Sequence, residues 1–132
     1  MGLFDLFTSK EKKEKLSHLK SLIALSLADG TVEKSELAAI SAVCSREGLT
    51  ENDLKKCLKN PASIHYEVPK DHNTRLRYLQ DMVLLMMSDG NFDKKEMATC
   101  KMAAEALGYR PEVIDAMILD IVAEMKRKME NI

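Results

Sequence analysis

Apolar residues recur along this chain at helical spacing, and no segment alternates in the manner of a half-buried strand. The first apolar stripe begins at Leu16 and covers nearly all sides of the predicted helix by Leu27. A second stripe of the same kind begins at Leu76 and ends at Met87. Helices that become more apolar toward one end are typical of helices that enter a hydrophobic core.

Residues that favour helix ends divide the first half of the chain into three predicted helices. Ser and Thr suit the start of a helix, and Gly suits its end because it can adopt a left-handed conformation. The third helix is predicted to continue to Leu58, before Asn60-Pro61 interrupts it. The predicted starts and stops are, in chain order, Ser9, Gly30, Thr31, Gly48 and Thr50.

Residues 61–72 show no helical period and are predicted to form a connecting loop. Three further helices are predicted after it. The first begins at Asp71 or Asn73 and the second follows Asn91, while the last covers residues 113–129 after Pro111. Gly90 and Gly108 are the predicted stops.

The two halves are copies of one pattern. Residues 22–36 read LIALSLADGTVEKSE, and residues 82–96 read MVLLMMSDGNFDKKE. The pairs Asp29 and Asp89, Gly30 and Gly90, Glu36 and Glu96, and Gly48 and Gly108 are each 60 positions apart. A constant offset through a helix, a turn and a second helix predicts an internal duplication.

The expected fold is therefore all-α. It has six or seven helices in a single bundle-like domain over residues 1–132, built from two related helical hairpins about a pseudo-two-fold axis. Within it, we expect an N-terminal arm (1–8), a first half (9–60), a connecting loop (61–72) and a second half (73–132).

Composition and charge narrow the classes of function. A net charge of −1 provides no general attraction for nucleic acid, and no apolar run reaches the roughly 20 residues of a membrane span. Cys44, Cys57 and Cys100 are odd in number and lack CxxC spacing. Buried, reduced thiols are typical of a cytoplasmic protein, which is the predicted location.

The repeated turn resembles half of a calcium-binding loop. An EF-hand loop has Gly at its sixth position and a bidentate Glu at its twelfth, which would be Gly30 with Glu36 and Gly90 with Glu96. The first and third positions, which should be acidic or Asn, are apolar in both copies. Neither loop is a complete site, so a cation site would need both turns to face each other.

Two interpretations of these acids stay open. In the first, the two turns pool carboxylates for Ca²⁺ or Mg²⁺, with Asp29, Glu33, Glu36, Asp89, Asp93 and Glu96 as candidate ligands. In the second, the acids only cap helices, each contributing about 1 kcal/mol. Glu36 and Glu96 are expected beyond the first helical turn, where capping alone would not explain them.

The first eight residues, MGLFDLFT, are apolar and contain two of the three Phe residues. Such an arm can fold back on the domain, dock on a partner or touch a membrane surface. The candidate contact residues are Leu3, Phe4, Leu6 and Phe7.

At the repeated turn the chain resembles the tellurite-resistance TerB-like family. The residues that carry this resemblance are Leu27-Ala28-Asp29-Gly30 with Glu36, Tyr66-Glu67-Val68-Pro69, Leu84-Leu85-Met86-Met87-Ser88-Asp89-Gly90 with Glu96, and Ala106-Leu107-Gly108-Tyr109. The resemblance implies a duplicated helical domain with a central acidic cluster for a divalent cation, formed by Asp29, Glu36, Asp89 and Glu96 and then by Glu33 and Asp93. It also implies an association with stress and metal-resistance systems, although nothing in these residues selects tellurite.

The predicted function is that of a non-enzymatic, stress-associated domain that binds a divalent cation and engages a protein partner. It can act in the cytoplasm or peripherally at the inner face of a membrane, and a homodimer is one assembly considered. The alternative is a structural adaptor whose acids only cap helices. A metal-dependent hydrolase is a third class, for which no nucleophile or general base can be named.

Overall fold

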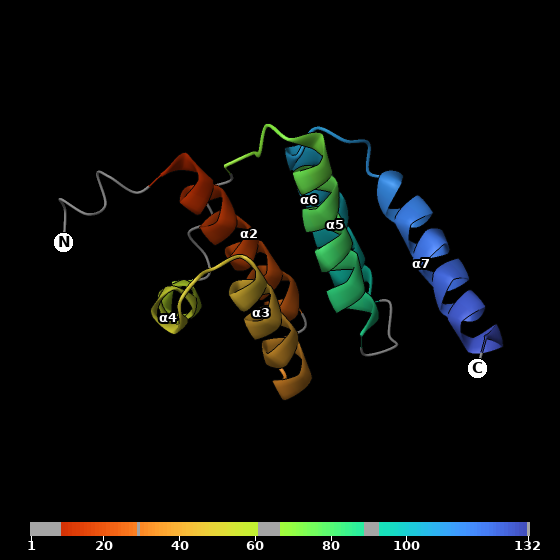
Figure 1. Ribbon diagram of the computed structural model, residues 1–132, viewed down its shortest axis with the longest axis horizontal. Coiled ribbons are helices and arrows are strands. Elements are labelled where there is room, and N and C mark those ends of the chain that lie inside the picture. Colours follow the sequence, from red (N-terminus) through yellow and green to blue (C-terminus); the bar gives the residue numbers. More distant parts are fainter. Residues whose placement is uncertain (1–8, 29, 61–66, 89–92, 132) are drawn as a thin grey trace.

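The computed structural model describes residues 9–28, 30–60, 67–88 and 93–131 (Figure 1). These residues form six helices and no strand, which confirms the all-α prediction for this part of the chain. The helices are α2 (Lys10–Leu27), α3 (Lys34–Arg46), α4 (Glu51–Lys59), α5 (His72–Met87), α6 (Lys94–Ala106) and α7 (Val113–Glu130). None of the described helices is long and apolar enough to cross a membrane.

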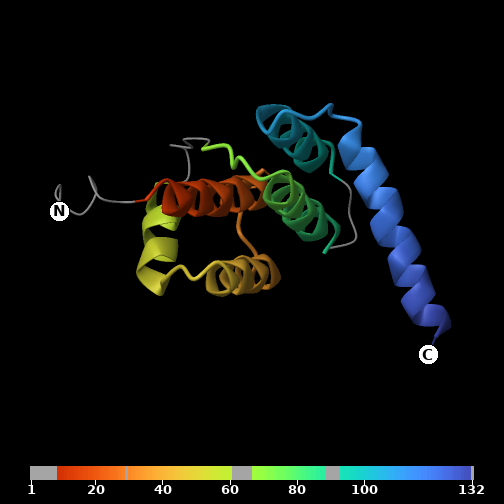
Figure 2. The same cartoon turned by 45° about the horizontal axis from the view of Figure 1, so that its top comes forward.

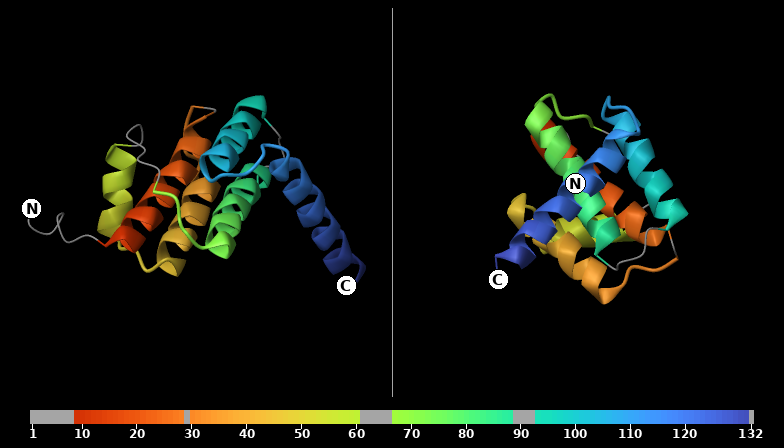
Figure 3. Two further views of the ribbon diagram at one scale, coloured as in Figure 1. Left: turned by 90° about the horizontal axis from the view of Figure 1, so that it is seen from above. Right: turned by 90° about the vertical axis from the view of Figure 1, so that its right-hand side faces the viewer.

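Helices α2 and α5 form the centre of the molecule. They pack against each other. Helix α2 also contacts α3, α4 and α6, and helix α5 also contacts α3, α6 and α7. The two run in the same direction, and α3 and α6 return alongside them (Figures 1 and 3). Helix α4 lies beside the start of α2, whereas α7 lies at the other end of the molecule (Figures 2 and 3). The second half of α7 extends away from the other helices.

The core is built from equivalent positions of the two central helices. Four pairs of buried apolar side chains, one from α2 and one from α5, are each 60 positions apart: Leu19 and Leu79, Leu22 and Met82, Ile23 and Val83, and Leu25 and Leu85. Burying a side chain of this size contributes about 1.5–3 kcal/mol. The repeated apolar stripe that predicts the helices is thus also the stripe that joins them.

The same offset holds for helix ends. Helices α3 and α6 begin 60 positions apart and end 60 positions apart, as Lys34 and Lys94, and Arg46 and Ala106, show. Gly48 and Gly108 follow them with φ of 72° and 91°, as predicted for glycines that end helices. After Gly48, the amide of Leu49 donates to the carbonyl of Cys44 at 2.9 Å. The amide of Tyr109 makes the equivalent bond to Ala104 at 2.9 Å.

Most of the predicted caps are confirmed. The side chains of Ser9, Thr50 and Asp71 each accept a hydrogen bond from an amide in the first turn of their helix. The prediction for Thr31 is wrong, because α3 begins at Lys34 and its N-cap is Glu33. The predicted Gly90 stop and Asn91 cap lie outside the described residues.

Replacing Gly48 tests the left-handed closure of α3. A side chain at positive φ is strained, and no other atom lies within 4 Å of the added Cβ, so conformation alone sets the cost. We expect Gly48→Ala to lower the free energy of unfolding by about 1–2 kcal/mol in urea titrations. Gly48→Asn is the matched control and should lose less, because Asn tolerates this conformation. Equal stability of the Ala variant and the wild type would contradict this account.

Candidate functional site

The structure describes four of the six predicted cation ligands and places each at the start of a helix. Asp29 and Asp89 lie outside the described residues. Glu33 is the N-cap of α3, and its amide donates to the Glu36 carboxylate at 3.1 Å. Asp93 is the N-cap of α6, and its carboxylate accepts from the Lys95 amide at 2.9 Å.

Glu36 and Glu96 lie within the first helical turn, so the expectation that they lie beyond it is wrong. The error follows from the later start of α3, which makes Glu36 its third residue. Both side chains are buried, with residue exposures of 4% and 2%.

Burial, followed by the charge of Glu96, raises the pKa of the Cys100 thiol to about 12. Cys44, Cys57 and Cys100 are free and buried, as predicted.

The described acids are not gathered into one centre. Glu33 and Glu36 are brought together by capping at the start of α3. Among the residues that the structure describes, no three His, Cys, Asp or Glu side chains are arranged to hold a metal ion. Capping therefore explains the contacts that Glu33, Glu36 and Asp93 make, and the pooled cation site stays a hypothesis that depends on Asp29 and Asp89.

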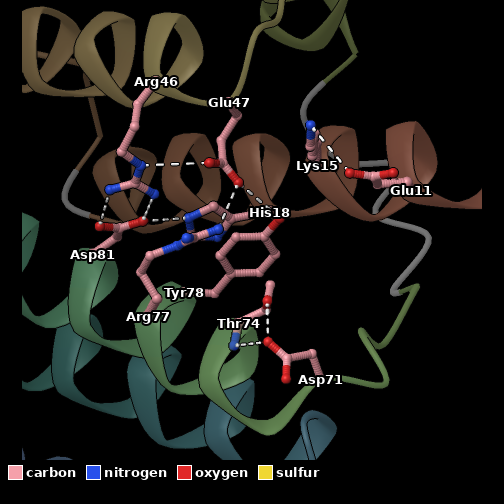
Figure 4. A network of polar contacts seen from close by, with 10 residues as sticks. All are labelled: Glu11, Lys15, His18, Arg46, Glu47, Asp71, Thr74, Arg77, Tyr78 and Asp81. Atoms are coloured by element: carbon pink, nitrogen blue, oxygen red, sulfur yellow. Dashed lines mark hydrogen bonds and ion pairs between the residues drawn. The ribbon is translucent and has the colours of Figure 1, made fainter.

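A polar network joins α2, α3 and α5, and residue patterns did not predict it (Figure 4). The His18 and Asp81 side chains are largely buried, whereas Arg46 is 41% exposed. His18 Nε2 lies 2.8 Å from Asp81 Oδ2. The Arg46 guanidinium donates to both oxygens of Asp81, at 2.9 and 2.6 Å. Such a two-pronged contact fixes the end of α3 against α5.

Glu47 continues this network on the other side of His18. It accepts a 3.0 Å hydrogen bond from the Tyr78 hydroxyl and lies 3.4 Å from an Arg77 nitrogen. The Tyr78 ring is stacked on the His18 ring, with centroids 3.8 Å apart and planes inclined by 4°. Contacts to Asp81 and Tyr78 thus hold the imidazole in a single orientation.

The environment of each group decides its charge. Burial lowers the pKa of His18 below its usual 6.5, against the opposing effect of the Asp81 hydrogen bond. Burial alone would raise the pKa of Asp81, but hydrogen bonds from Arg46 and His18 outweigh it and hold that pKa below 3.8. Burial and then the charge of Glu47 raise the pKa of Tyr78 above 10.0. The network therefore combines a neutral histidine and phenol with an ionised Asp81–Arg46 pair near neutral pH.

One sequence signal could have led to this network. His18 and Tyr78 are 60 positions apart, so they are the same position of the duplicated pattern. Equivalent positions on two central helices are expected to meet if the halves pack symmetrically. The partners Asp81 and Arg46 carry no such signal, because their equivalents Ser21 and Ala106 cannot form an ion pair.

An apolar groove lies between α5 and α7. Its upper part, beside the first half of α7, has a volume of about 430 Å³. Its lower part, beside the second half of α7, has a volume of about 520 Å³. The two parts share Gln80, Asp120 and Ile121. Apolar side chains supply much of the lining: Leu76, Leu84, Val113, Ala116, Met117, Ile121, Ala123 and Met125.

The first half contains the equivalent of this groove between α2 and α4. Six of its lining residues correspond to lining residues of the upper groove at an offset of 60: Leu16 and Leu76, Lys20 and Gln80, Asp53 and Val113, Lys56 and Ala116, Cys57 and Met117, and Asn60 and Asp120. The first-half groove is charged, and an ion pair of 3.6 Å from Lys12 to Asp53 connects its walls. Its counterpart has Val113 at the position of Asp53 and cannot form that pair.

Large apolar side chains are exposed along the second-half groove and on the outer part of α7. Leu84 and Met125, which line the groove, are 46% and 56% exposed. Leu119 on α7 is 71% exposed but does not line the groove.

The arm residues Leu3, Phe4, Leu6 and Phe7, which were predicted to contact a partner or a membrane, lie outside the described residues.

Comparisons with known proteins identify no relative. No protein-family model, curated protein or solved structure matches this chain.

Titration of His18 should appear in the pH dependence of stability. Because its folded-state pKa lies below the unfolded value, the unfolded chain binds the proton more readily as pH falls below about 6.5. We expect urea-determined stability to fall between pH 7 and pH 5, by at most about 1.4 kcal/mol per pH unit from this group.

The control variant His18→Phe keeps a ring against Tyr78 but cannot titrate. It should be less dependent on pH over this range, whatever its stability at pH 7. Asp81 does not interfere, since its pKa lies below 3.8. Equal slopes for the two proteins would show that His18 does not control this dependence.

Proposed function

We propose that this protein is a non-enzymatic protein-interaction module, and that the groove between α5 and α7 is its binding surface. The observation that carries the proposal is the exposure of Leu84 and Met125 beside this groove. Water is in contact with apolar groups there, and covering them with an apolar segment of a partner would be favourable by about 25 cal/mol for each Å². The TerB-like resemblance adds a stress-associated setting to this proposal.

The duplicated sequence pattern supports the proposal, because it allows the groove of the second half to be compared with the equivalent groove of the first half. We take the halves to be related by a pseudo-two-fold axis between α2 and α5. If α2, α3 and α4 are exchanged with α5, α6 and α7, the α2·α5 pair is unchanged and every other pair of contacting helices becomes another contacting pair. The stacking of the equivalent His18 and Tyr78 rings fits an axis that passes between them.

Comparison of the two grooves indicates specialisation. The first-half groove has three charged side chains, Lys20, Asp53 and Lys56. At the equivalent positions the second half has Gln80, Val113 and Ala116. Helix α4 ends at Lys59, while α7 continues to Glu130 and extends the second groove. An extended groove with a largely apolar lining is typical of a surface that binds a helix or peptide.

A non-enzymatic role agrees with how the polar network is used. His18 is 4% exposed, and the cavity beside it and Tyr78 has a volume of about 20 Å³. A space of that size accommodates about one water molecule rather than a substrate. The network is better suited to holding α3 against the central helices.

Site-specific photocrosslinking tests the groove. The photoreactive amino acid p-benzoylphenylalanine would replace Met125, and in a control protein Leu119, which is also on α7 and is 71% exposed. We expect protein adducts from position 125, identified by mass spectrometry, and few from position 119. Adducts of equal yield at both positions, or none at 125, would contradict the proposed surface.

Divalent-cation binding is a second candidate function, favoured by one observation. Glu36 and Glu96 occupy equivalent positions and are 4% and 2% exposed. A cation held by these two side chains together with Asp29, Asp89, Glu33 and Asp93 would bind carboxylates from both halves of the repeated sequence pattern. Ca²⁺ and Mg²⁺ are the ions whose oxygen preference fits this set.

Thermal melts with EDTA and with graded Ca²⁺ or Mg²⁺ test this second function. A ligand that binds only the folded state stabilises it by about 2.7 kcal/mol at a hundredfold excess over its Kd, which raises Tm by several degrees. We expect a saturable rise that Glu36→Gln combined with Glu96→Gln abolishes.

The matched control is Glu51→Gln combined with Glu112→Gln, which changes two acids at the starts of α4 and α7 outside the repeated turn. This control should keep the full metal response. Identical melting curves in EDTA and in metal would rule out the cation site.

A further inference from the structure

We infer that the groove between α5 and α7 binds residues 1–8 of a second copy of this chain, so that two copies exchange their N-terminal arms. This inference rests on the proposed function, because it names the occupant of the same groove. It joins two apolar features that are otherwise unassigned: the exposed groove, and an arm that contains Leu3, Phe4, Leu6 and Phe7.

The chemistry of the groove fits an aromatic segment. Met117 lines its upper part and Met125 its lower part, and Ile121 lies in both. Methionine side chains are flexible and polarizable, so they adapt to inserted rings and make favourable sulfur–aromatic contacts. The arm offers two rings, Phe4 and Phe7. They are three positions apart, and in a helical conformation they would project from one side.

The lower groove also contains one cation that can pair with the arm. The only charged side chain among residues 1–8 is Asp5, which stands between the two apolar pairs. The charged residues that line the lower groove are Asp120, Glu124, Arg127 and Lys128. Arg127 pairs with Glu124 at 2.6 Å, which leaves Lys128 as the better-placed cation for Asp5.

The position of the arm favours a second copy over the same molecule. Residue 9 precedes α2, whose first turn lies at the end of the molecule opposite to α7 (Figures 1 and 3). The arm is therefore attached at the end of the molecule opposite to α7, away from the groove of its own copy. Exchange of both arms gives a closed dimer with two identical contacts, which is the commonest symmetry of homo-oligomers.

Sedimentation velocity of the full-length chain tests this arrangement. The wild type should form a concentration-dependent dimer. The arm variant, Phe4→Asp with Phe7→Asp, and the groove variant, Leu84→Glu with Met125→Glu, should each be monomeric. The matched control, Met102→Glu with Leu119→Glu, changes two side chains that are 70% and 71% exposed outside the groove, and it should dimerise like the wild type. Circular dichroism would verify that each variant is folded.

Mixing the arm variant with the groove variant provides the decisive measurement. A homodimer of either variant would lack both arm–groove contacts. In the mixed pair, the intact arm of the groove variant can bind the intact groove of the arm variant. We expect a one-to-one heterodimer whose Kd is about 10²–10⁴-fold higher than that of the wild-type dimer, since one contact of two remains. A monomeric wild type, a groove variant that still dimerises, or a mixture that stays monomeric would overturn the inference.

Vesicles that contain anionic lipid distinguish arm docking from membrane attachment. If the arm variant loses vesicle binding and the groove variant keeps it while the wild type is monomeric, the arm is a membrane element and the inference is wrong. Photocrosslinks from position 125 separate this inference from the proposed function. Adducts with a second copy support both, whereas adducts only with a different protein leave the proposed function and overturn the arm exchange.

Discussion

The pairing of α2 with α5 is the contact on which the rest of the structure depends. Equivalent apolar residues from the two helices, such as Leu22 and Met82, meet in the core, and the His18 and Tyr78 rings are stacked between them. Every other described helix packs against at least one of these two. A substitution that separates α2 from α5 would therefore expose most of the core, whereas α7 contributes only two of the buried apolar side chains, Ile114 and Ile121.

The polar network adds specificity to this apolar pairing. Asp81 receives hydrogen bonds from Arg46 at the end of α3 and contacts His18 on α2, so three helices meet at one carboxylate. Asp81 is largely buried and Arg46 is 41% exposed, so desolvation of the carboxylate offsets part of the attraction, and the loss of Arg46 would leave a largely buried charge without this partner. The second half places Ala106 where the first has Arg46, so only the first half has this clamp. The duplicated pattern thus supports different chemistry on its two sides.

The same divergence separates the two grooves. Lys12 and Asp53 connect the walls of the first, while Val113 makes the second unable to form such a pair and leaves it apolar. Exposure of apolar side chains to water is unfavourable in free energy, and a partner that covers them would remove this penalty. We therefore assign the interaction function to the second half. The acids of the repeated turns have a local structural role that the first interpretation did not allow for, since Glu36 lies in the first turn of α3 and accepts the Glu33 amide.

Local sequence determined the helices, most of their caps and the apolar stripes, because capping and helical periodicity act over only a few residues. It also revealed the 60-residue offset that helix ends and core positions follow. Tertiary structure alone decided that His18 pairs with Asp81, 63 positions away, and that Arg46 reaches the same carboxylate across 35 positions. It also decided that α5 and α7 leave an apolar groove between them. These features depend on how helices pack, and contacts between distant residues follow from the geometry of the whole core rather than from any local pattern.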